Sequence, residues 1–211
     1  MEGIDIIKAH FPDLTLDKYE RLETLVAVFL DTNDQINLIS RKDAEHIWTR
    51  HILHSLSVAK MADFQKGMKV ADVGTGGGLP GLPLAILFPE TEFTLIDSVG
   101  KKIKAVNHML ESLDLENVTA VNKRMEEVKG SFDFVVSRAV KPLPMMHEWL
   151  KGKIKKGNKG ELPNGLIYIK GGDYQQELDL IGCNYRYWYL DDWFDDPFFE
   201  TKKIVWLDIA R

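Results

Sequence analysis

The sequence predicts an α/β fold: a mostly parallel sheet covered by helices, closed by an antiparallel hairpin and preceded by a helical extension. Three observations predict it. Short β-like runs alternate with amphipathic helical stretches from Met68 onward, the last two runs have no helix between them, and the first 66 residues carry helical periodicity alone. The composition, 45% hydrophobic and 28% charged over 211 residues, is typical of one globular protein and excludes a disordered or repetitive chain.

Residues 1–66 are expected to form the helical extension and residues 67–211 the main domain, together one compact unit. In the extension, apolar side chains recur at three- and four-residue spacings, which gives each helix one apolar stripe. Two sets follow this pattern: Tyr19, Leu22, Leu25, Val26, Phe29 and Leu30, and then Ile47, His51, Ile52, Ser55, Leu56 and Ala59. Charges interrupt the N-terminus and no run approaches 18 apolar residues, so the sequence predicts neither export nor membrane insertion.

Five short apolar runs are the expected parallel strands of the main domain. They cover residues 69–73, 92–96, 118–121, 132–137 and 166–170. Helical stretches lie between them, the clearest at 101–113, and this alternation indicates helices on both sides of a parallel sheet. Two last runs, 184–190 and 203–210, are joined only by a turn-rich segment, so they are expected to form the closing hairpin.

The glycine-rich loop after the first run is the most informative segment. Five of the eight residues from 74 to 81 are glycines, and Pro83 then opens a helix-like stretch. Glycine is needed where φ is positive or where a ligand approaches the backbone, and a helix N-terminus offers free N–H groups. The loop is richer in glycine than a plain strand-to-helix turn requires, so it predicts a cofactor site.

The glycine spacing alone is compatible with two cofactors. Gly76, Gly78 and Gly81 satisfy the G-x-G-x-x-G pattern of NAD sites, and Asp97 lies about 20 residues further on. Asp72, however, begins a D-x-G-x-G arrangement that resembles motif I of S-adenosylmethionine-dependent methyltransferases. A carboxylate there is unfavourable beside a pyrophosphate but suits the ammonium and sulfonium of S-adenosylmethionine. Asp72 and the closing hairpin favour this cofactor, and an NAD-dependent oxidoreductase is the alternative.

Two further segments are expected to contact the cofactor. Asp97 ends the second run, where a carboxylate can accept both ribose hydroxyls and can also cap the following helix. Met125 and Glu126 follow the third run, where this fold places the adenine. A thioether can pack on the adenine ring, and a nearby backbone N–H or side chain can bond its edge.

The sequence lacks the motifs of two other kinds of methyl transfer, which narrows the choice of the atom that is methylated. Ser137 and Arg138 stand where amine methylases of this fold usually carry Asn or Asp followed by Pro-Pro-aromatic. Cys183, the single cysteine, has no neighbouring Pro and is unsuited as the nucleophile of C5 methylation. It cannot form an internal disulfide, and no Cys and His spacing suggests zinc, which indicates a reducing compartment and no metal. A ring nitrogen such as guanine N7 needs no base, so no catalytic base is assigned, and Arg138 is the one catalytic candidate.

Eight short segments occur in the order found in one bacterial family. They are NLIS (37–40), RHIL (50–53), DVGTGGGLPG (72–81), IDS (96–98), GKK (100–102), FD (132–133), SRA (137–139) and KG (170–171). From about residue 33 to 172, the chain thereby resembles the 16S ribosomal RNA guanine-N7 methyltransferases, the small-subunit methyltransferase G or glucose-inhibited division protein B family.

This resemblance implies a Rossmann-like, seven-stranded S-adenosylmethionine-dependent methyltransferase domain over residues 67–211. It further implies a cytoplasmic, monomeric enzyme that methylates N7 of the guanine at position 527 in the decoding-region loop of 16S rRNA, within the 30S subunit or an assembly intermediate. By position, the family's cofactor contacts fall on Gly74, Leu79, Met125, Glu126 and Arg138. Arg138 is suited to hold either the methionine carboxylate or an RNA phosphate, since ligands bind at the carboxyl ends of such strands.

RNA contacts are expected at three places. Arg50 and His51 resemble the family's Arg-His-x-x-Asp-Ser pattern, although His54 replaces the Asp here and any pairing made by that Asp is lost. Lys170 ends the fifth run, where it can reach a phosphate or solvent. The third place is the lysine-rich run 151–160, a phosphate-binding patch or a solvated loop, with candidates Lys151, Lys153, Lys155 and Lys156.

The net charge of −5 does not exclude RNA, because the charge is unevenly distributed. Residues 100–159 carry 13 basic and 7 acidic side chains, net +6, so the remainder carries −11. Residues 171–200 alone hold eight acids and one arginine. The protein is therefore expected to bind RNA through one face, with an affinity that falls as salt rises. A methyltransferase acting on a small molecule or a protein is the second alternative.

Overall fold

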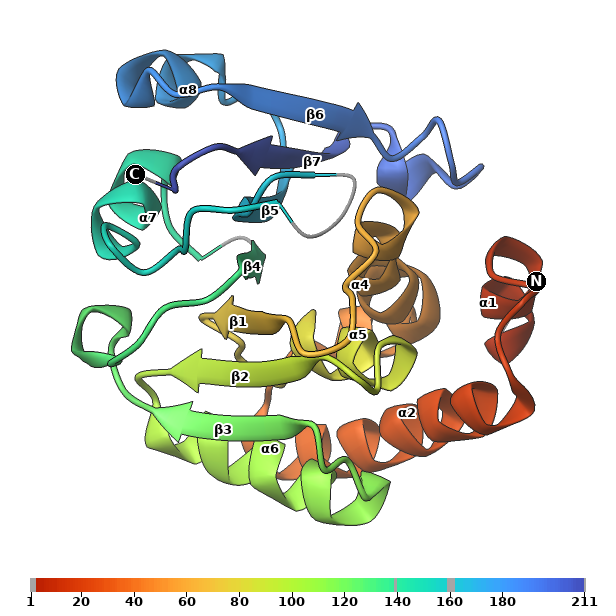
Figure 1. Ribbon diagram of the computed structural model, residues 1–211. Helices are drawn as coiled ribbons and strands as arrows, with labels where there is room; N and C mark the ends of the chain where they lie inside the picture. The colour runs from red at the N-terminus through yellow and green to blue at the C-terminus, as the bar shows by residue number, and fades with distance from the viewer. Residues whose placement is uncertain (1–2, 139, 159–161, 211) are drawn as a thin grey trace.

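A seven-stranded sheet forms the centre of the computed structural model, which describes residues 3–138, 140–158 and 162–210 (Figure 1). The strand order is β3-β2-β1-β4-β5-β7-β6. The strands are β1 (Lys69–Val73), β2 (Glu92–Asp97), β3 (Val118–Asn122), β4 (Phe134–Arg138), β5 (Gly165–Gly171), β6 (Tyr185–Tyr189) and β7 (Lys202–Leu207). Strands β1 to β5 are parallel, whereas β7 is antiparallel to both β5 and β6. The predicted fold class is confirmed, including the closing hairpin.

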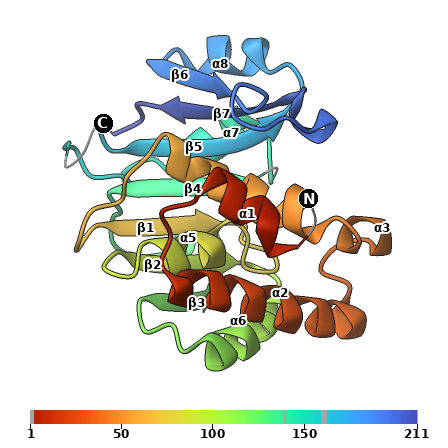
Figure 2. The same cartoon turned by 90° about the vertical axis from the view of Figure 1, so that its right-hand side faces the viewer.

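Helices cover both faces of the sheet, as Figures 1 and 2 show. The N-terminal segment forms α1 (Ile4–His10), α2 (Leu16–Ile36), α3 (Arg41–Ala44), the π-helical turn η1 (Trp48–Leu53), α4 (His54–Leu56) and the 3₁₀ turn η2 (Ser57–Lys60). The sheet domain adds α5 (Gly81–Leu87), α6 (Gly100–Leu113), η3 (Met125–Glu127), α7 (Leu143–Trp149), α8 (Gln175–Ile181) and η4 (Pro197–Phe199). Helix α2 packs against α5 and α6 on one side, and α7 packs against α8 on the other.

Alternation along the strands divides the buried side chains into two apolar clusters. In β4, Val136 belongs to the cluster beneath α2, α5 and α6, and its neighbour Val135 belongs to the cluster beneath α7 and α8. Phe29 of α2 and Met146 of α7 are fully buried in these two clusters. Because the central strands β1, β4 and β5 bury side chains on both faces, the middle of the sheet is held rigidly from both sides.

The helical periodicity of the extension is present, but its second stretch is wound irregularly. The expected stripe is buried at Ile47, Ile52 and Leu56. The Ser55 hydroxyl donates to the His51 carbonyl at 2.6 Å, and the Ser57 hydroxyl donates to the His54 carbonyl at 2.6 Å. Such side-chain bonds to carbonyls compete with regular helical bonds, which accounts for the sequence of π, α and 3₁₀ turns.

The fourth strand begins two residues later than predicted. Phe132 instead forms an isolated bridge with Ile154, and its N–H donates to the Lys153 carbonyl at 2.8 Å. The Asp133 carboxylate accepts from the Lys69 N–H at 2.7 Å. The Phe132 N–H and the Lys69 N–H are thus bonded outside the regular strand ladder, and β4 starts at Phe134.

Candidate active site

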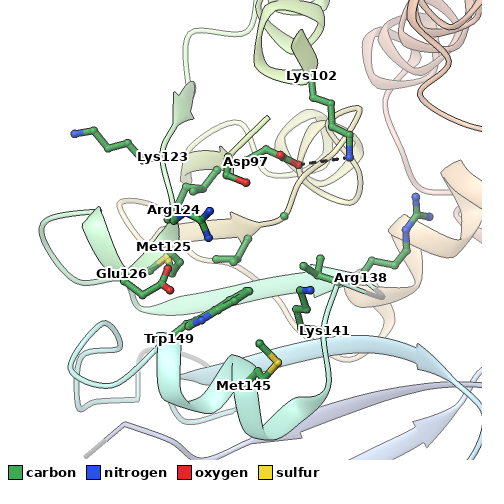
Figure 3. A pocket seen from close by; sticks show the side chains of 15 residues that line it. Asp97, Lys102, Lys123, Arg124, Met125, Glu126, Arg138, Lys141, Met145 and Trp149 are labelled. Carbon is green, nitrogen blue, oxygen red and sulfur yellow. Dashed lines mark ion pairs between the residues drawn. The ribbon is translucent and has the colours of Figure 1, made fainter. Parts of the chain in front are cut away.

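A cleft of about 630 Å³ lies at the carboxyl ends of the parallel strands (Figure 3). Open α/β sheets bind ligands at this edge, where the strand order reverses between β1 and β4. The following residues line it: Val73, Gly74, Ile96, Asp97, Ser98, Lys102, Lys123, Arg124, Met125, Glu126, Arg138, Val140, Lys141, Met145 and Trp149. Five of the predicted cofactor contacts are therefore together: Gly74, Asp97, Met125, Glu126 and Arg138.

The glycine loop passes from β1 into α5 in a conformation that other residues rarely adopt. Gly74, Gly76 and Gly78 have φ angles of 72°, 58° and 89°. A Cβ at Gly74 would lie 2.3 Å from Cγ2 of Val140, a cleft residue that follows β4. Gly74 is thus required both by its φ angle and by the close approach of the two segments.

The Asp72 carboxylate lies behind the loop and does not line the cleft. It is fully buried, and its Oδ2 accepts from the Thr75 hydroxyl at 2.6 Å and from the Gly81 N–H at 2.8 Å. Burial raises the pKa of Asp72 to about 6, although both hydrogen bonds oppose this shift. Asp72 therefore fixes the loop from its two ends, where the sequence had suggested a carboxylate facing the cofactor. Gly76, Gly78 and Leu79 belong to the same loop and likewise do not line the cleft.

Asp97 lies just before α6, whose N-cap residue is Val99, and it also reaches the cleft. Its Oδ1 accepts from the Val99 N–H at 2.8 Å at the start of α6, and its Oδ2 accepts from the Gly76 N–H at 3.0 Å. The ammonium of Lys102 is 4.0 Å from Oδ2. Each carboxylate oxygen has a further lone pair, so Asp97 can still accept the two hydroxyls of a ribose.

The opposite wall of the cleft contains residues that the sequence reasoning missed. Figure 3 shows Arg124, which precedes η3, and Met125 and Glu126 of η3 beside Trp149 of α7, with Met145 one turn away. The four-residue spacing of Met145 and Trp149 is typical of a helix face that packs against the core. Only the tertiary placement of α7 shows that both line the cleft. Two more missed residues, Lys123 and Lys141, add positive charge to its lining.

Arg138 connects the cleft to the N-terminal helices. Its Nη2 is 3.3 Å from Nδ1 of His51, and its Nη1 donates to the His51 carbonyl at 3.4 Å. Burial lowers the pKa of Arg138 to about 10, while Asp72 opposes this shift. Burial, and then the charge of Arg138, lowers the pKa of His51 to about 4. Because a guanidinium only donates, Nδ1 of His51 must accept, and the neutral ring carries its proton on Nε2.

The other residues of the Arg-His pattern lie among aromatic rings. The guanidinium of Arg50 pairs with Asp43 at 3.2 Å and stands 5.7 Å from the centre of the Phe198 ring. His54 is buried, with its ring edge-on to Phe198 and Phe199 at centroid distances of 5.3 and 5.9 Å. His54 thus lies in an aromatic environment, and burial holds its pKa well below the usual value.

The lysines expected to bind RNA are not gathered in the cleft. Lys170 pairs with Glu177. Lys151 pairs with Glu148 at 2.7 Å and Lys155 with Asp133 at 3.4 Å, whereas Lys153 donates to the carbonyls of Glu126 and Val128 and Lys156 is exposed. Three of the four lysines in 151–156 therefore have partners within the protein. Ala139 of the SRA segment and Lys159 and Gly160 of the lysine-rich run lie outside the described residues.

Two negative findings apply to the part of the chain that the structure describes. No group of three or more His, Cys, Asp or Glu side chains there is arranged to hold a metal ion. Nor does that part contain a helix long and apolar enough to cross a membrane.

The lining of the cleft fits S-adenosylmethionine. Gly74 exposes backbone without a side chain in the lining, Asp97 offers carboxylate lone pairs to a ribose, and Arg138 offers a cation to a carboxylate. With the 3-2-1-4-5-7-6 strand order, these features define the class: an S-adenosylmethionine-dependent methyltransferase.

Two solved structures share the fold. A methyltransferase from Aquifex aeolicus has a TM-score of 0.52 at 18% identity, covering 72% of this chain and 87% of that one. Fibrillarin from Aeropyrum pernix with bound S-adenosyl-L-methionine has a TM-score of 0.55 at 9% identity, and the match covers 75% of each chain.

The chain belongs to the rRNA small subunit methyltransferase G family, whose family model matches residues 18–182. It is 53% identical over 201 residues to the ribosomal RNA small subunit methyltransferase G of Flavobacterium psychrophilum, covering 95% of both chains. It is 49% identical over 207 residues to the protein of the same name from Christiangramia forsetii, covering 97% of this chain and 96% of that one. Membership decides between the two cofactors that the glycine pattern left open, in favour of S-adenosylmethionine.

Proposed function

We propose that this protein transfers a methyl group from S-adenosylmethionine to N7 of a guanine in 16S rRNA, at position 527 by family resemblance. The observation that carries this proposal is that Gly74, Asp97, Met125 and Arg138, which come from four separate segments, line one cleft. The names of its close relatives support an rRNA substrate. N7 has a free lone pair, which agrees with a cleft in which we assign no catalytic base.

We further propose a separate role for each of the predicted cofactor contacts. Asp97 accepts the ribose hydroxyls, and Met125 and Glu126 contact the adenine. Gly74 allows the methionine portion to approach the backbone. The remaining predicted residues act through the loop, because Asp72 ties together its two ends and the Leu79 N–H donates to the Thr75 carbonyl at 2.9 Å.

The chemistry needs little beyond binding and orientation. S-adenosylmethionine, when bound, would supply a methyl group from its sulfonium to the N7 lone pair by in-line displacement, with S-adenosylhomocysteine as the leaving group. The chain's residues hold the two reactants and exclude water: Val140, Met145 and Trp149 form an apolar wall, while Arg138 presents a cation. Lys102, Lys123, Arg124 and Lys141 make the lining basic, which favours an RNA phosphate near the cleft.

Several features of the working enzyme belong to the same proposal. It acts as a monomer in the cytoplasm, without a metal ion, on the 30S subunit or an assembly intermediate. Residues 1–66 form an extension of the methyltransferase domain, 67–211; they present Arg50 to the RNA, and His51 acts through its contact with Arg138. The contact between His51 and Arg138 supports this role, since it joins the extension to the cleft.

Transfer to 30S subunits from a strain that lacks the activity tests this function. With S-adenosylmethionine labelled in its methyl group, the protein is expected to label 16S rRNA. Arg138→Ala should lose at least tenfold in kcat/KM, and the exposed variant Lys66→Gln should match the wild type. Label in a protein or small molecule without RNA would instead favour the second alternative, and no label in 16S rRNA would refute the proposal.

A further inference from the structure

A small aromatic pocket lies outside the cleft, between the start of α8 and the ends of β6 and β7. It measures about 160 Å³, and Tyr174, Tyr187, Tyr189 and Lys203 are among the residues that line it. Tyr187 and Tyr189 alternate along the edge strand β6, which gives them the same face, and they remain 44% and 40% exposed. Two neighbouring, partly exposed aromatic rings offer a surface on which a flat ligand can stack.

Lys203 gives the pocket a positive charge without a neutralising partner. Its ammonium lies 4.8 Å from the ring centre of Tyr189 and 5.7 Å from those of Tyr174 and Tyr187. No carboxylate of the described residues forms an ion pair with it, whereas neighbouring Lys170 is paired with Glu177. The ammonium disfavours a cationic ligand in this aromatic cage and favours an anion beside the rings.

Tyr174 adds a hydrogen-bonding group to the pocket. Its side chain is 5% exposed, and its buried hydroxyl has no hydrogen-bond partner among the described residues. Asp173, the acid in the lining, accepts from the Gln175 N–H at 3.0 Å and keeps its charge, so the ammonium of Lys203 is the group in this lining that can attract a phosphate. The Tyr174 hydroxyl is therefore an unsatisfied polar group at the wall of the pocket.

The pocket shares an edge of the sheet with the cleft. Lys203 is directly opposite Lys170 at the carboxyl end of β5, and Tyr189 is opposite Lys203 on the far side. Arg138 ends β4, the neighbour of β5. Two strand spacings, about 10 Å, therefore separate the ends of β4 and β7, a distance that nucleotides next to a bound guanine can span.

We propose that this pocket binds one unstacked nucleotide of the RNA substrate beyond the methylated guanine, its base against Tyr187 and Tyr189 and its phosphate beside Lys203. Bases stack on aromatic side chains regardless of sequence, and single-stranded loops offer such bases. Acids at 191, 192 and 195 in the segment after β6 repel a longer backbone, which limits the contact to one nucleotide. The inference rests on the proposed function.

Kinetics with 30S subunits test the pocket. Tyr187→Leu and Tyr189→Leu should each raise the KM for RNA about tenfold, with kcat and S-adenosylmethionine affinity unchanged. Tyr187→Phe keeps the ring and should stay within twofold of the wild type. Lys203→Gln should lower the salt dependence of RNA binding by about one phosphate contact, and Lys66→Gln should not. Melting temperatures verify that the variants are folded, as expected for substitutions at exposed rings.

Each outcome has a distinct meaning. Unchanged KM in both leucine variants, with an active wild type, refutes the pocket alone, whereas an inactive wild type refutes the proposed function beneath it. Ultraviolet crosslinking to 30S subunits identifies the class of partner. A nucleotide adduct on Tyr187 or Tyr189 supports the inference, and an adduct with a ribosomal protein at these residues overturns it.

Discussion

Arg138 and His51 form the contact through which the N-terminal extension reaches the cleft. A protonated His51 would put a second cation 3.3 Å from the guanidinium, and its pKa of about 4 keeps the ring neutral near pH 7. Neutral His51 accepts at Nδ1 and so restricts the orientation of Arg138. We regard His51 as a positioning residue, which acts on either reactant through Arg138.

Two substitutions of His51 distinguish the effect of its hydrogen-bond acceptor from the effect of its size. His51→Phe removes the acceptor and is expected to lower kcat/KM at least tenfold, whereas His51→Asn, whose Oδ1 lies near the position of Nδ1, should recover much of the loss. Steady-state methyl transfer measures both. A raised KM for S-adenosylmethionine would mean that Arg138 holds the methionine carboxylate, and a raised KM for RNA that it holds a phosphate. Equal losses in the two variants would contradict the positioning role.

Asp97→Ala tests the proposed ribose contact. Hydrogen bonds to a carboxylate contribute roughly 1.5–3 kcal/mol each, so losing two should weaken S-adenosylmethionine binding about a hundredfold or more. RNA affinity should change much less. Calorimetric titration of the cofactor and a filter-binding measurement of RNA provide the comparison, with exposed Asp17→Ala as the control. Unchanged cofactor affinity in Asp97→Ala would rule out the ribose role.

At the scale of elements, the β1–α5 loop is built around its backbone conformation. Gly74 and Gly67 both have a φ of 72°, but a Cβ at Gly74 would strike Val140, whereas a Cβ at Gly67 would meet nothing within 4 Å. The two glycines therefore separate the cost of a left-handed backbone from the cost of a clash in the cleft.

Gly74→Ala and Gly67→Ala form a matched pair. Each should lose about 1 kcal/mol of unfolding free energy from the unfavourable φ. Gly74→Ala should lose more, because Val140 must move, and should also lose S-adenosylmethionine binding. Urea unfolding and calorimetric titration measure the two effects. Similar cofactor affinity in both variants would contradict the close approach at Gly74.

Sequence patterns predicted the helices and strands better than they predicted which side chains are available to bind a ligand. The alternating runs identified every strand, since each buried strand is a short apolar segment. The lysine-rich run could not be assigned from the sequence, because the partners of Lys153 and Lys155 are a loop carbonyl and the buried Asp133, more than 20 residues away. Trp149 was missed for a related reason: an aromatic residue on a short helix does not reveal whether it meets the core or a cleft.

At the scale of the whole molecule, buried titratable groups make stability depend on pH. His51 and His54 have lowered pKa values, so the unfolded chain binds their protons first as pH falls below 6.5. Asp72 acts in the opposite sense, because its raised pKa of about 6 makes the folded state bind a proton first. Together, these two histidines and one carboxylate leave a net uptake of about one proton on unfolding between pH 6.5 and 5, and His10, whose pKa burial also lowers, adds to this uptake.

The unfolding free energy should therefore fall by roughly 1.4 kcal/mol per pH unit in that window. His54→Phe, which suits the neighbouring Phe198 and Phe199, removes one titrating group and should make the slope clearly shallower. Urea unfolding at pH 7, 6 and 5 measures both slopes. An unchanged slope in His54→Phe would show that His54 does not titrate in this way.

The central claim, a cleft that directs a methyl group to guanine N7 in 16S rRNA, is tested most directly by mapping the modified nucleotide. After incubation with S-adenosylmethionine and 30S subunits from a strain lacking the activity, 16S rRNA is treated with borohydride and aniline, which break the chain at N7-methylguanosine. Primer extension should then stop at one new site, the guanine at position 527. Incorporated methyl label without this stop, or with a stop at another nucleotide, would contradict the account.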